Sequence, residues 1–333
     1  MATELDTWLA LTTEEVIDPG LPICDPHHHF WDRPESRYLL DELLEDISGG
    51  HNIKETVFIE CSSMYRADGP ELSRPIGETE FVQGLAAMSA SGGYGDTKVA
   101  AGIVSYADLS AGDAVTAVLE SHIAASSNRF RGVRNSSCWD EDPGVRSYKS
   151  PMKGLLANAK FREGFSALDR LGLSFDAWLY HTQLGELADL ARAFPGVPII
   201  LDHIAGPLGI LSYAGKRDEV FQAWKAGMTD LATCPNVVIK LGGFGMPLGG
   251  FEWHKREAPP SSADIADVMG PYYRHCIEAF GADRCMFESN FPVDRISIGY
   301  PVLWNGLKKI AARYDAAAQD AMFAGTARRV YRI

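Results

Sequence analysis

Short apolar runs alternate with longer stretches of helical periodicity along most of the chain. The apolar runs predict β-strands at Pro22–His28, Thr56–Cys61, Val99–Tyr106, Phe130–Asn135, Ser174–Tyr180, Pro198–Ile204, Val237–Gly242 and Arg284–Ser289. Helices are predicted at Glu80–Ser89, Asp113–Ala125, Phe161–Leu171, Leu184–Phe194, Asp218–Thr233, Ala263–Phe280, Pro301–Tyr314 and Ala316–Tyr331. Strands that alternate with helices pair in parallel, because parallel strands need a crossover connection.

Eight alternating strands predict a (β/α)8 TIM-like barrel of the α/β class. We expect a single domain at residues 21–333, preceded by an N-terminal extension at residues 1–20. An open, doubly wound sheet is the competing architecture, and periodicity alone does not separate the two. No glycine-rich dinucleotide or phosphate fingerprint follows the first strand, which disfavours the open sheet.

Three predicted strand-to-helix connections are long, and they follow strands 2, 4 and 7. They span Ser62–Thr79, Ser136–Lys160 and Phe244–Ser262. Long loops in compact domains usually carry function, and these would emerge at the carboxyl ends of the strands, where barrel active sites lie. The site is therefore predicted at that face.

The charge balance narrows the class of partner. The 333 residues include 31 basic and 44 acidic side chains, which gives a net charge of −13. This excess disfavours nucleic acid and anionic membrane surfaces as partners, whereas a small anionic substrate stays compatible with it. We expect a small-molecule, anionic substrate and a homo-oligomer.

Other features of the sequence favour a cytoplasmic protein. No apolar run is long enough to span a membrane, and the acidic N-terminus does not resemble a signal peptide. The six cysteines are scattered, without a C-x-x-C pair, so we expect them to be reduced and mostly buried.

The strongest local motif is a run of three histidines at the end of the first strand, Asp25-Pro26-His27-His28-His29. Side chains alternate along a strand, so His27 and His29 should point to one side and His28 to the other. Two imidazoles at positions i and i+2 can hold one divalent metal ion. The alternative is a hydrogen-bonded histidine cluster without metal.

Polar side chains also end most of the other strands. They are Glu60, Arg134, His181, His203, Lys240, Glu288 and Asn290. Polar groups at one end of buried strands are costly unless they are paired or line a cavity. Their recurrence therefore predicts a site into which they converge.

Together these motifs resemble the amidohydrolase superfamily. The segments DPHHHFWD, FRGVRNS, LDHIAGP, VVIKLGG and SNFP are similar to its amidohydrolase-related (family 2) branch, which includes lactonases and decarboxylases, over about residues 20–331. The resemblance implies a TIM-like barrel with a metal or substrate at His27 and His29. His203 matches the histidine of the branch's D-H-x-G-like motif.

Two residues differ from the motifs of this branch and change what the resemblance implies. Asn290 stands where the last-strand motif has an aspartate that serves as ligand or base, and an amide cannot accept a proton as a carboxylate does. Glu288 and Asp294 are the nearest replacements. Arg134 stands in place of a metal-bridging lysine on the fourth strand, so the resemblance implies at most one metal ion.

The candidate site then has three groups of residues. Metal ligands are expected among His27, His29, His203 and Glu288, with zinc as the first expectation, manganese as the alternative and a metal-free site left open. Catalytic roles are expected for Glu288, Glu60, His203 and Asp294. Substrate contacts are expected from Arg134, Lys240, Tyr65, Arg66, His181, Asn290, Trp253 and His254.

Several of these residues have a structural alternative. Glu60 could pair with Arg66 or Lys240, and Arg134 could form an internal salt bridge. Asp202 is expected to face away from His203 and anchor the structure. Trp178 is expected in the barrel core.

The leading functional hypothesis is a hydrolase that opens a lactone or related ester of a carboxylated or aromatic-derived compound. A bound metal or cationic side chains would polarise the carbonyl group, and a carboxylate would accept the proton of the attacking water. The first alternative is a decarboxylase of an aromatic or muconate-like acid on the same scaffold. The second is a binding protein without catalytic activity, which only Asn290 supports.

Overall fold

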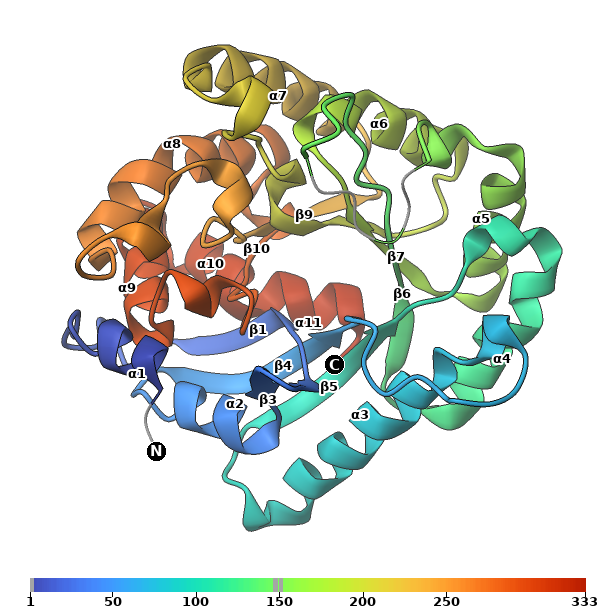
Figure 1. Cartoon of the computed structure of the whole chain (residues 1–333), viewed down its shortest axis with the longest axis horizontal. Coiled ribbons are helices and arrows are strands. Elements are labelled where there is room, and N and C mark those ends of the chain that lie inside the picture. The colour runs from blue at the N-terminus through green and yellow to red at the C-terminus, as the bar shows by residue number, and fades with distance from the viewer. Residues whose placement is uncertain (1–2, 146–148, 150–151) are drawn as a thin grey trace.

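Eight parallel strands form one sheet whose order follows the chain. The computed structural model describes residues 3–145, 149 and 152–333. The strands are β1 (Pro22–His28), β4 (Asn52–Ile59), β5 (Lys98–Ser105), β6 (Phe130–Ser136), β7 (Ser174–Trp178), β8 (Ile199–Leu201), β9 (Val237–Leu241) and β10 (Cys285–Phe287). Figure 1 shows them curling around a centre, with helices outside.

The sheet returns to its first strand and forms a nearly closed barrel. Beyond β10, Phe291 forms a parallel bridge with His28. The His29 N–H donates to the Phe291 carbonyl oxygen at 2.8 Å, and the Asn290 N–H donates to the His27 carbonyl oxygen at 3.0 Å. These bonds satisfy backbone groups that an open sheet would leave unpaired, and the prediction of a (β/α)8 TIM-like barrel is confirmed.

Helices cover the outside of the barrel. They are α2 (Leu40–Ile47), α3 (Ile76–Met88), α4 (Val115–Ala125), α5 (Ala159–Leu171), α6 (Leu184–Ala193), α7 (Arg217–Leu231), α8 (Ser262–Phe280) and α9 (Tyr300–Ala311). Their buried residues join the outward-facing residues of the strands in one large apolar cluster. A smaller cluster fills the barrel interior, where Val57, Val104 and Ile200 pack with Tyr331.

The C-terminal segment departs from the single helix predicted at Ala316–Tyr331. It consists of α10 (Ala316–Asp320), a π-helical turn at Ala321–Gly325 and α11 (Thr326–Tyr331). The wider turn directs Phe323 into the core, where its ring lies 4.8 Å from that of Phe287. The last helix, α11, then lies near the middle of the view in Figure 1 and packs against the interior cluster.

A hairpin and two helices were not predicted from the sequence. The hairpin pairs β2 (Trp31–Arg33) with β3 (Ser36–Tyr38), antiparallel, directly after β1, and α2 follows it. Strands of three residues are too short for a period to show. Near the N-terminus lies α1 (Glu4–Leu9), and Glu14 accepts from the Ser262 N–H at the start of α8 at 2.7 Å. The division into residues 1–20 and 21–333 stays a prediction.

Three long connections leave the carboxyl ends of β4, β6 and β9, as predicted. The connection after β6 includes residues 146–148, 150 and 151, which lie outside the described residues. Within the part of the chain that the structure describes, no helix combines the length and apolarity needed to cross a membrane. All six cysteines are buried and free, as expected.

Candidate active site

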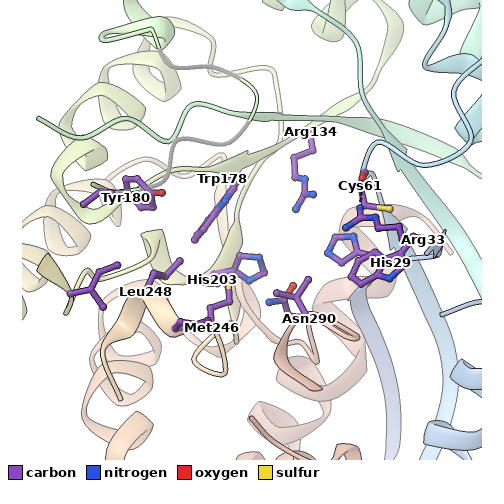
Figure 2. Close-up of a pocket in the computed structure, with 15 residues that line it drawn as sticks. His29, Arg33, Cys61, Arg134, Trp178, Tyr180, His203, Met246, Leu248 and Asn290 are labelled. Atoms are coloured by element: carbon purple, nitrogen blue, oxygen red, sulfur yellow. Dashed lines mark hydrogen bonds between the residues drawn. The ribbon is translucent and has the colours of Figure 1, made fainter. Parts of the chain in front are cut away.

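A cavity of about 390 Å³ opens at the carboxyl ends of the strands (Figure 2). Its volume suits a small organic molecule. The lining residues are His29, Trp31, Arg33, Cys61, Arg134, Val145, Trp178, Tyr180, His203, Ile210, Met246, Pro247, Leu248, Asn290 and Val293. None of these described lining residues is an aspartate or glutamate, although the chain carries 44 acidic side chains.

The first-strand histidines alternate as their spacing predicts. The Nε2 atoms of His27 and His29 lie 3.3 Å apart. His28 lies on the other side, where its Nε2 is 2.9 Å from the Thr56 hydroxyl. His29 Nδ1 lies 2.7 Å from the Ile59 carbonyl oxygen, which can only accept. His29 therefore carries its proton on Nδ1 when neutral, and its Nε2 has a free lone pair.

Burial lowers the pKa of His27 and of His29 well below the ordinary value. The positive charge of Lys240 adds to the effect at His27, and that of Arg134 adds to it at His29. Both imidazoles are therefore neutral near pH 7, which is the protonation state that a metal ligand needs.

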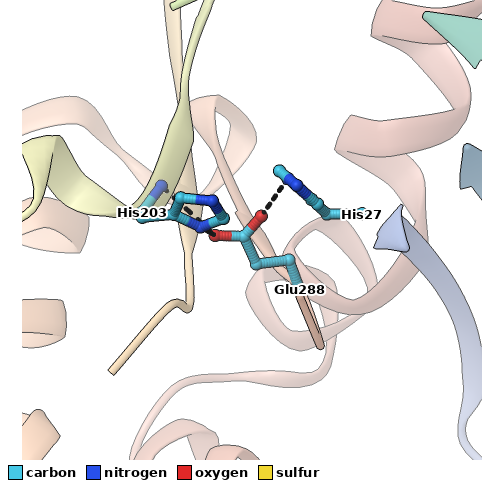
Figure 3. A group of neighbouring side chains, drawn as sticks. All are labelled: His27, His203 and Glu288. Carbon is cyan, nitrogen blue, oxygen red and sulfur yellow. Dashed lines mark hydrogen bonds and ion pairs between the residues drawn. The ribbon is translucent and has the colours of Figure 1, made fainter. Parts of the chain in front are cut away.

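Glu288 lies between the imidazoles of His27 and His203 (Figure 3). Its Oε1 lies 2.7 Å from His203 Nδ1, and its Oε2 lies 2.8 Å from His27 Nδ1. Burial alone would raise the pKa of this carboxyl, but the contacts with His203 and His27 outweigh it and hold the pKa at about 2. Glu288 is fully buried and does not line the cavity.

His203 sits in a backbone turn that aims its ring at the cavity. The turn follows β8, and His203 has a left-handed φ of 54°. With Nδ1 held by Glu288, Nε2 is the nitrogen available to the cavity. The ring also packs edge-on against Trp178, with centroids 4.8 Å apart. The carboxylate thus fixes both the orientation and the tautomer of this imidazole.

Glu60 is held in a buried ion-pair network. It accepts from Arg134 Nε at 3.1 Å and also contacts Lys149 Nζ. Burial would raise its pKa, but Lys149 and Arg134 lower it below the ordinary range. Arg134 Nη1 lies 3.4 Å from His27 Nε2 and lines the cavity. Glu60 therefore positions Arg134. The internal salt bridge considered for Arg134 is present, and its partner is Glu60.

Lys240 lies below the histidines and outside the cavity lining. It is fully buried, 2.7 Å from Asp176 and 3.0 Å from Asp202. Its Nζ is also 3.3 Å from His27 Nδ1. Asp202 was expected to face away from His203 and to anchor the structure. It lies outside the cavity lining that His203 joins, and it helps to neutralise Lys240.

Asn290 lines the cavity, with Asp294 behind it. Asn290 Nδ2 donates to Asp294 Oδ1 at 2.7 Å, while the Gly245 N–H donates to Oδ2 at 2.9 Å. Burial raises the pKa of Asp294 to about 7, against the lowering effect of the Gly245 bond. Asn290 has a φ of 56°, a left-handed conformation that asparagine tolerates well. The bond to Asp294 uses the amide nitrogen of Asn290 and not its carbonyl oxygen.

Besides Lys240, five of the predicted substrate-binding residues lie outside the cavity lining. Arg66 is exposed and pairs with Glu80. Trp253 is 1% exposed and belongs to the apolar core. The other three are Tyr65, whose hydroxyl is bonded by Lys149, His181, which packs against Tyr213, and the partly exposed His254.

Several cavity residues were missed from the sequence. Trp178, expected in the barrel core, lines the cavity together with Tyr180, which lies two residues further along. Residues two apart along a strand face the same side, so their spacing could have indicated that both side chains face the cavity. Trp31 and Arg33 come from the unpredicted hairpin, so no sequence pattern marked them.

The comparisons with known proteins agree with this architecture. A family model described as amidohydrolase matches residues 24–333. The chain belongs to the amidohydrolase family. A protein of Sinorhizobium fredii, y4mH, is 33% identical over 327 residues, which cover 94% of this chain and 99% of that protein.

Two further similar proteins are described by activity or by family. The L-fucono-1,5-lactonase of Burkholderia ambifaria is 27% identical over 290 residues, covering 82% of this chain and 81% of that protein. An amidohydrolase of Burkholderia multivorans, crystallised with bound zinc, has a TM-score of 0.70 and 23% identity, covering 93% of this chain and 99% of that one. Family membership and the lactonase relatives identify the chain as a hydrolase.

The donor set of this amidohydrolase fits a single divalent metal ion. Zinc–nitrogen bonds of 2.0–2.1 Å in a tetrahedron place two nitrogens about 3.3 Å apart. The Nε2 atoms of His27 and His29 have this separation. The buried group of His27, His203 and Glu288 offers ligand atoms within 4.8 Å of one another.

Proposed function

We propose that this amidohydrolase hydrolyses a lactone, with His203 as the general base. The supporting observation is the pair formed by Glu288 and His203 at 2.7 Å, which leaves an imidazole Nε2 at the cavity. The lining contains no described carboxylate, so His203 is better placed than Glu60, Glu288 or Asp294 to accept a proton directly from water. The lactonase relatives favour this reaction class.

The proposed reaction begins with water attacking the lactone carbonyl carbon. His203 Nε2 takes the proton of the attacking water, and Glu288 stabilises the imidazolium that forms. The carbonyl oxygen gains negative charge, which Arg134 stabilises from the lining. The ring C–O bond then breaks, and the proton held by His203 passes to the leaving oxygen. The product is a hydroxy acid.

His27 and His29 would hold a divalent metal ion through their facing Nε2 atoms, which leaves His203 Nε2 to accept the proton. Such an ion polarises a carbonyl group and lowers the pKa of bound water. Zinc is the first expectation from the nitrogen donors and manganese the alternative. Glu288 holds His27 through Nδ1, which leaves His27 Nε2 directed toward His29.

The test is a panel of five- and six-membered lactones, including L-fucono-1,5-lactone, with ring opening followed by acid release. The proposal expects turnover of at least one lactone and its loss in His203→Ala. Absence of ring opening across the panel would contradict it. Release of carbon dioxide from an aromatic acid would favour the decarboxylase alternative instead.

A further inference from the structure

Arg33 is an exposed cation at one end of the cavity (Figure 2). It ends β2, close to His29 and Cys61 in the figure. Its Nη2 donates to the Cys61 carbonyl oxygen at 3.0 Å, and its guanidinium carbon lies 4.4 Å from the centroid of the Trp31 ring. Two neutral contacts therefore hold the guanidinium in place without neutralising its charge.

The two cavity arginines differ in their partners. Arg134 pairs with Glu60 at 3.1 Å and lies 3.7 Å from Asp202, so carboxylates of the protein balance its charge. Among the ion pairs between described residues, none includes Arg33, although Arg37 on the same hairpin pairs with Glu42 and Asp41. Arg33 is thus the unbalanced positive charge of a lining without described carboxylates.

The opposite end of the cavity is apolar. Figure 2 shows Tyr180 and Leu248 there, across His203 and Trp178 from Arg33. Met246 lies on the same side. The cavity therefore has a cationic end and an apolar end, with the imidazoles between them. A ligand that matches it carries a negative charge at one end and an apolar body at the other.

We propose that Arg33 binds a carboxylate of the substrate and thereby selects carboxylated lactones with an apolar or aromatic body. This assignment of substrate class rests on the proposed lactone hydrolysis. A planar guanidinium held by one N–H still offers further donors, which suit a carboxylate. A neutral polyhydroxylated lactone would leave Arg33 without a counter-ion and bring hydroxyl groups against Met246 and Leu248, where they would lose hydrogen bonds to water.

The first test measures binding and does not depend on turnover. Phenylpropanoate and its neutral isostere phenylpropanamide are titrated into the enzyme, and quenching of tryptophan fluorescence reports occupancy, because Trp31 and Trp178 line the cavity. We expect the carboxylate to bind at least about tenfold more tightly than the amide. Arg33→Gln should bring the two dissociation constants within about twofold.

Arg37→Gln is the matched control, since Arg37 lies on the same hairpin but outside the lining. It should keep the preference for the carboxylate, and Arg33→Lys should restore part of it. Retention of the full preference in Arg33→Gln would overturn the proposal. Equal binding of the two probes by the unaltered enzyme would also overturn it, and so would binding of neither probe.

The second test compares dihydrocoumarin with a dihydrocoumarin carboxylate as substrates. Arg33→Gln should raise KM for the carboxylate at least about tenfold and should affect KM for the neutral lactone much less. An equal loss for both lactones would overturn the assignment to Arg33. If the enzyme opens neither lactone while the binding preference holds, the proposed hydrolysis fails on these substrates and the carboxylate site stands.

Discussion

Glu288 Oε1 lies 2.7 Å from His203 Nδ1, and the carboxylate is fully buried behind the imidazole. The ring nitrogen on the far side is therefore the one that reaches the cavity. In the proposed mechanism Glu288, predicted from the sequence as a catalytic carboxylate, is a positioning group, and the imidazole contacts the reacting water.

The first prediction concerns this pair. His203→Ala should lower kcat for lactone hydrolysis by about a hundredfold to ten-thousandfold, as expected for loss of a general base. Glu288→Gln should lower it by about tenfold to a hundredfold, because the imidazole loses its orientation. Steady-state kinetics check both values, and circular dichroism checks that both variants fold.

The double variant distinguishes a coupled pair from two independent groups. His203→Ala combined with Glu288→Gln should lose less than the product of the two single losses, because Glu288 acts on His203 as well as on His27. Fully multiplicative losses in the double variant would show that Glu288 does not act through His203.

The second prediction concerns metal binding. Elemental analysis of the purified protein should find about one divalent ion per chain, and both His27→Ala and His29→Ala should lose it, because each removes one of the two facing nitrogens. His275→Asn, at a site bonded to Thr229 on the barrel exterior, should keep it. Full metal content in His29→Ala would exclude this ligand pair.

The third prediction concerns the buried ion pair of Glu60 and Arg134. Glu60→Gln should destabilise the fold by about 3 kcal/mol, since it removes the nearer of the two carboxylates that balance the buried guanidinium. Glu80→Gln, which breaks the exposed pair with Arg66, should cost about 0.5 kcal/mol or less. Urea unfolding measures both. Equal small losses would mean that solvent or another group compensates the charge of Arg134.

The fourth prediction concerns the pH dependence of stability. Burial lowers the pKa of His122 to about 4 from an ordinary 6.5. The unfolded chain therefore takes up a proton first as the pH falls, and the folded state loses stability between about pH 6.5 and pH 4. From these two values, the loss by pH 5 is about 2 kcal/mol.

His122→Gln should remove that part of the pH dependence. The difference in unfolding free energy between pH 7 and pH 5 should be about 2 kcal/mol smaller in the variant than in the unaltered protein, as urea titrations at each pH would measure. An identical pH dependence in the two proteins would mean that His122 is protonated in the fold at pH 5.

The sequence predicted the barrel and the convergence of polar groups well, because both depend on regular strands. His27 and His29 lie together because strand alternation places them there. The motif resemblance also indicated the family correctly.

The features that the sequence did not predict lie where regular structure ends. His203 follows β8 in a left-handed turn, so strand alternation did not give the direction of its ring. Glu288 follows β10 directly, and the turn at Asn290 brings Asn290, not Glu288, to the lining. Arg33 depends on a hairpin with three-residue strands, whose pairing no periodicity reveals.

The central claim is hydrolytic ring opening by water that attacks the lactone carbonyl. The most direct measurement is the mass of the product after a single turnover in water labelled with heavy oxygen. The account predicts one heavy oxygen in the new carboxylate and none in the released hydroxyl group. An unlabelled carboxylate, or a product that has lost carbon dioxide, would contradict it.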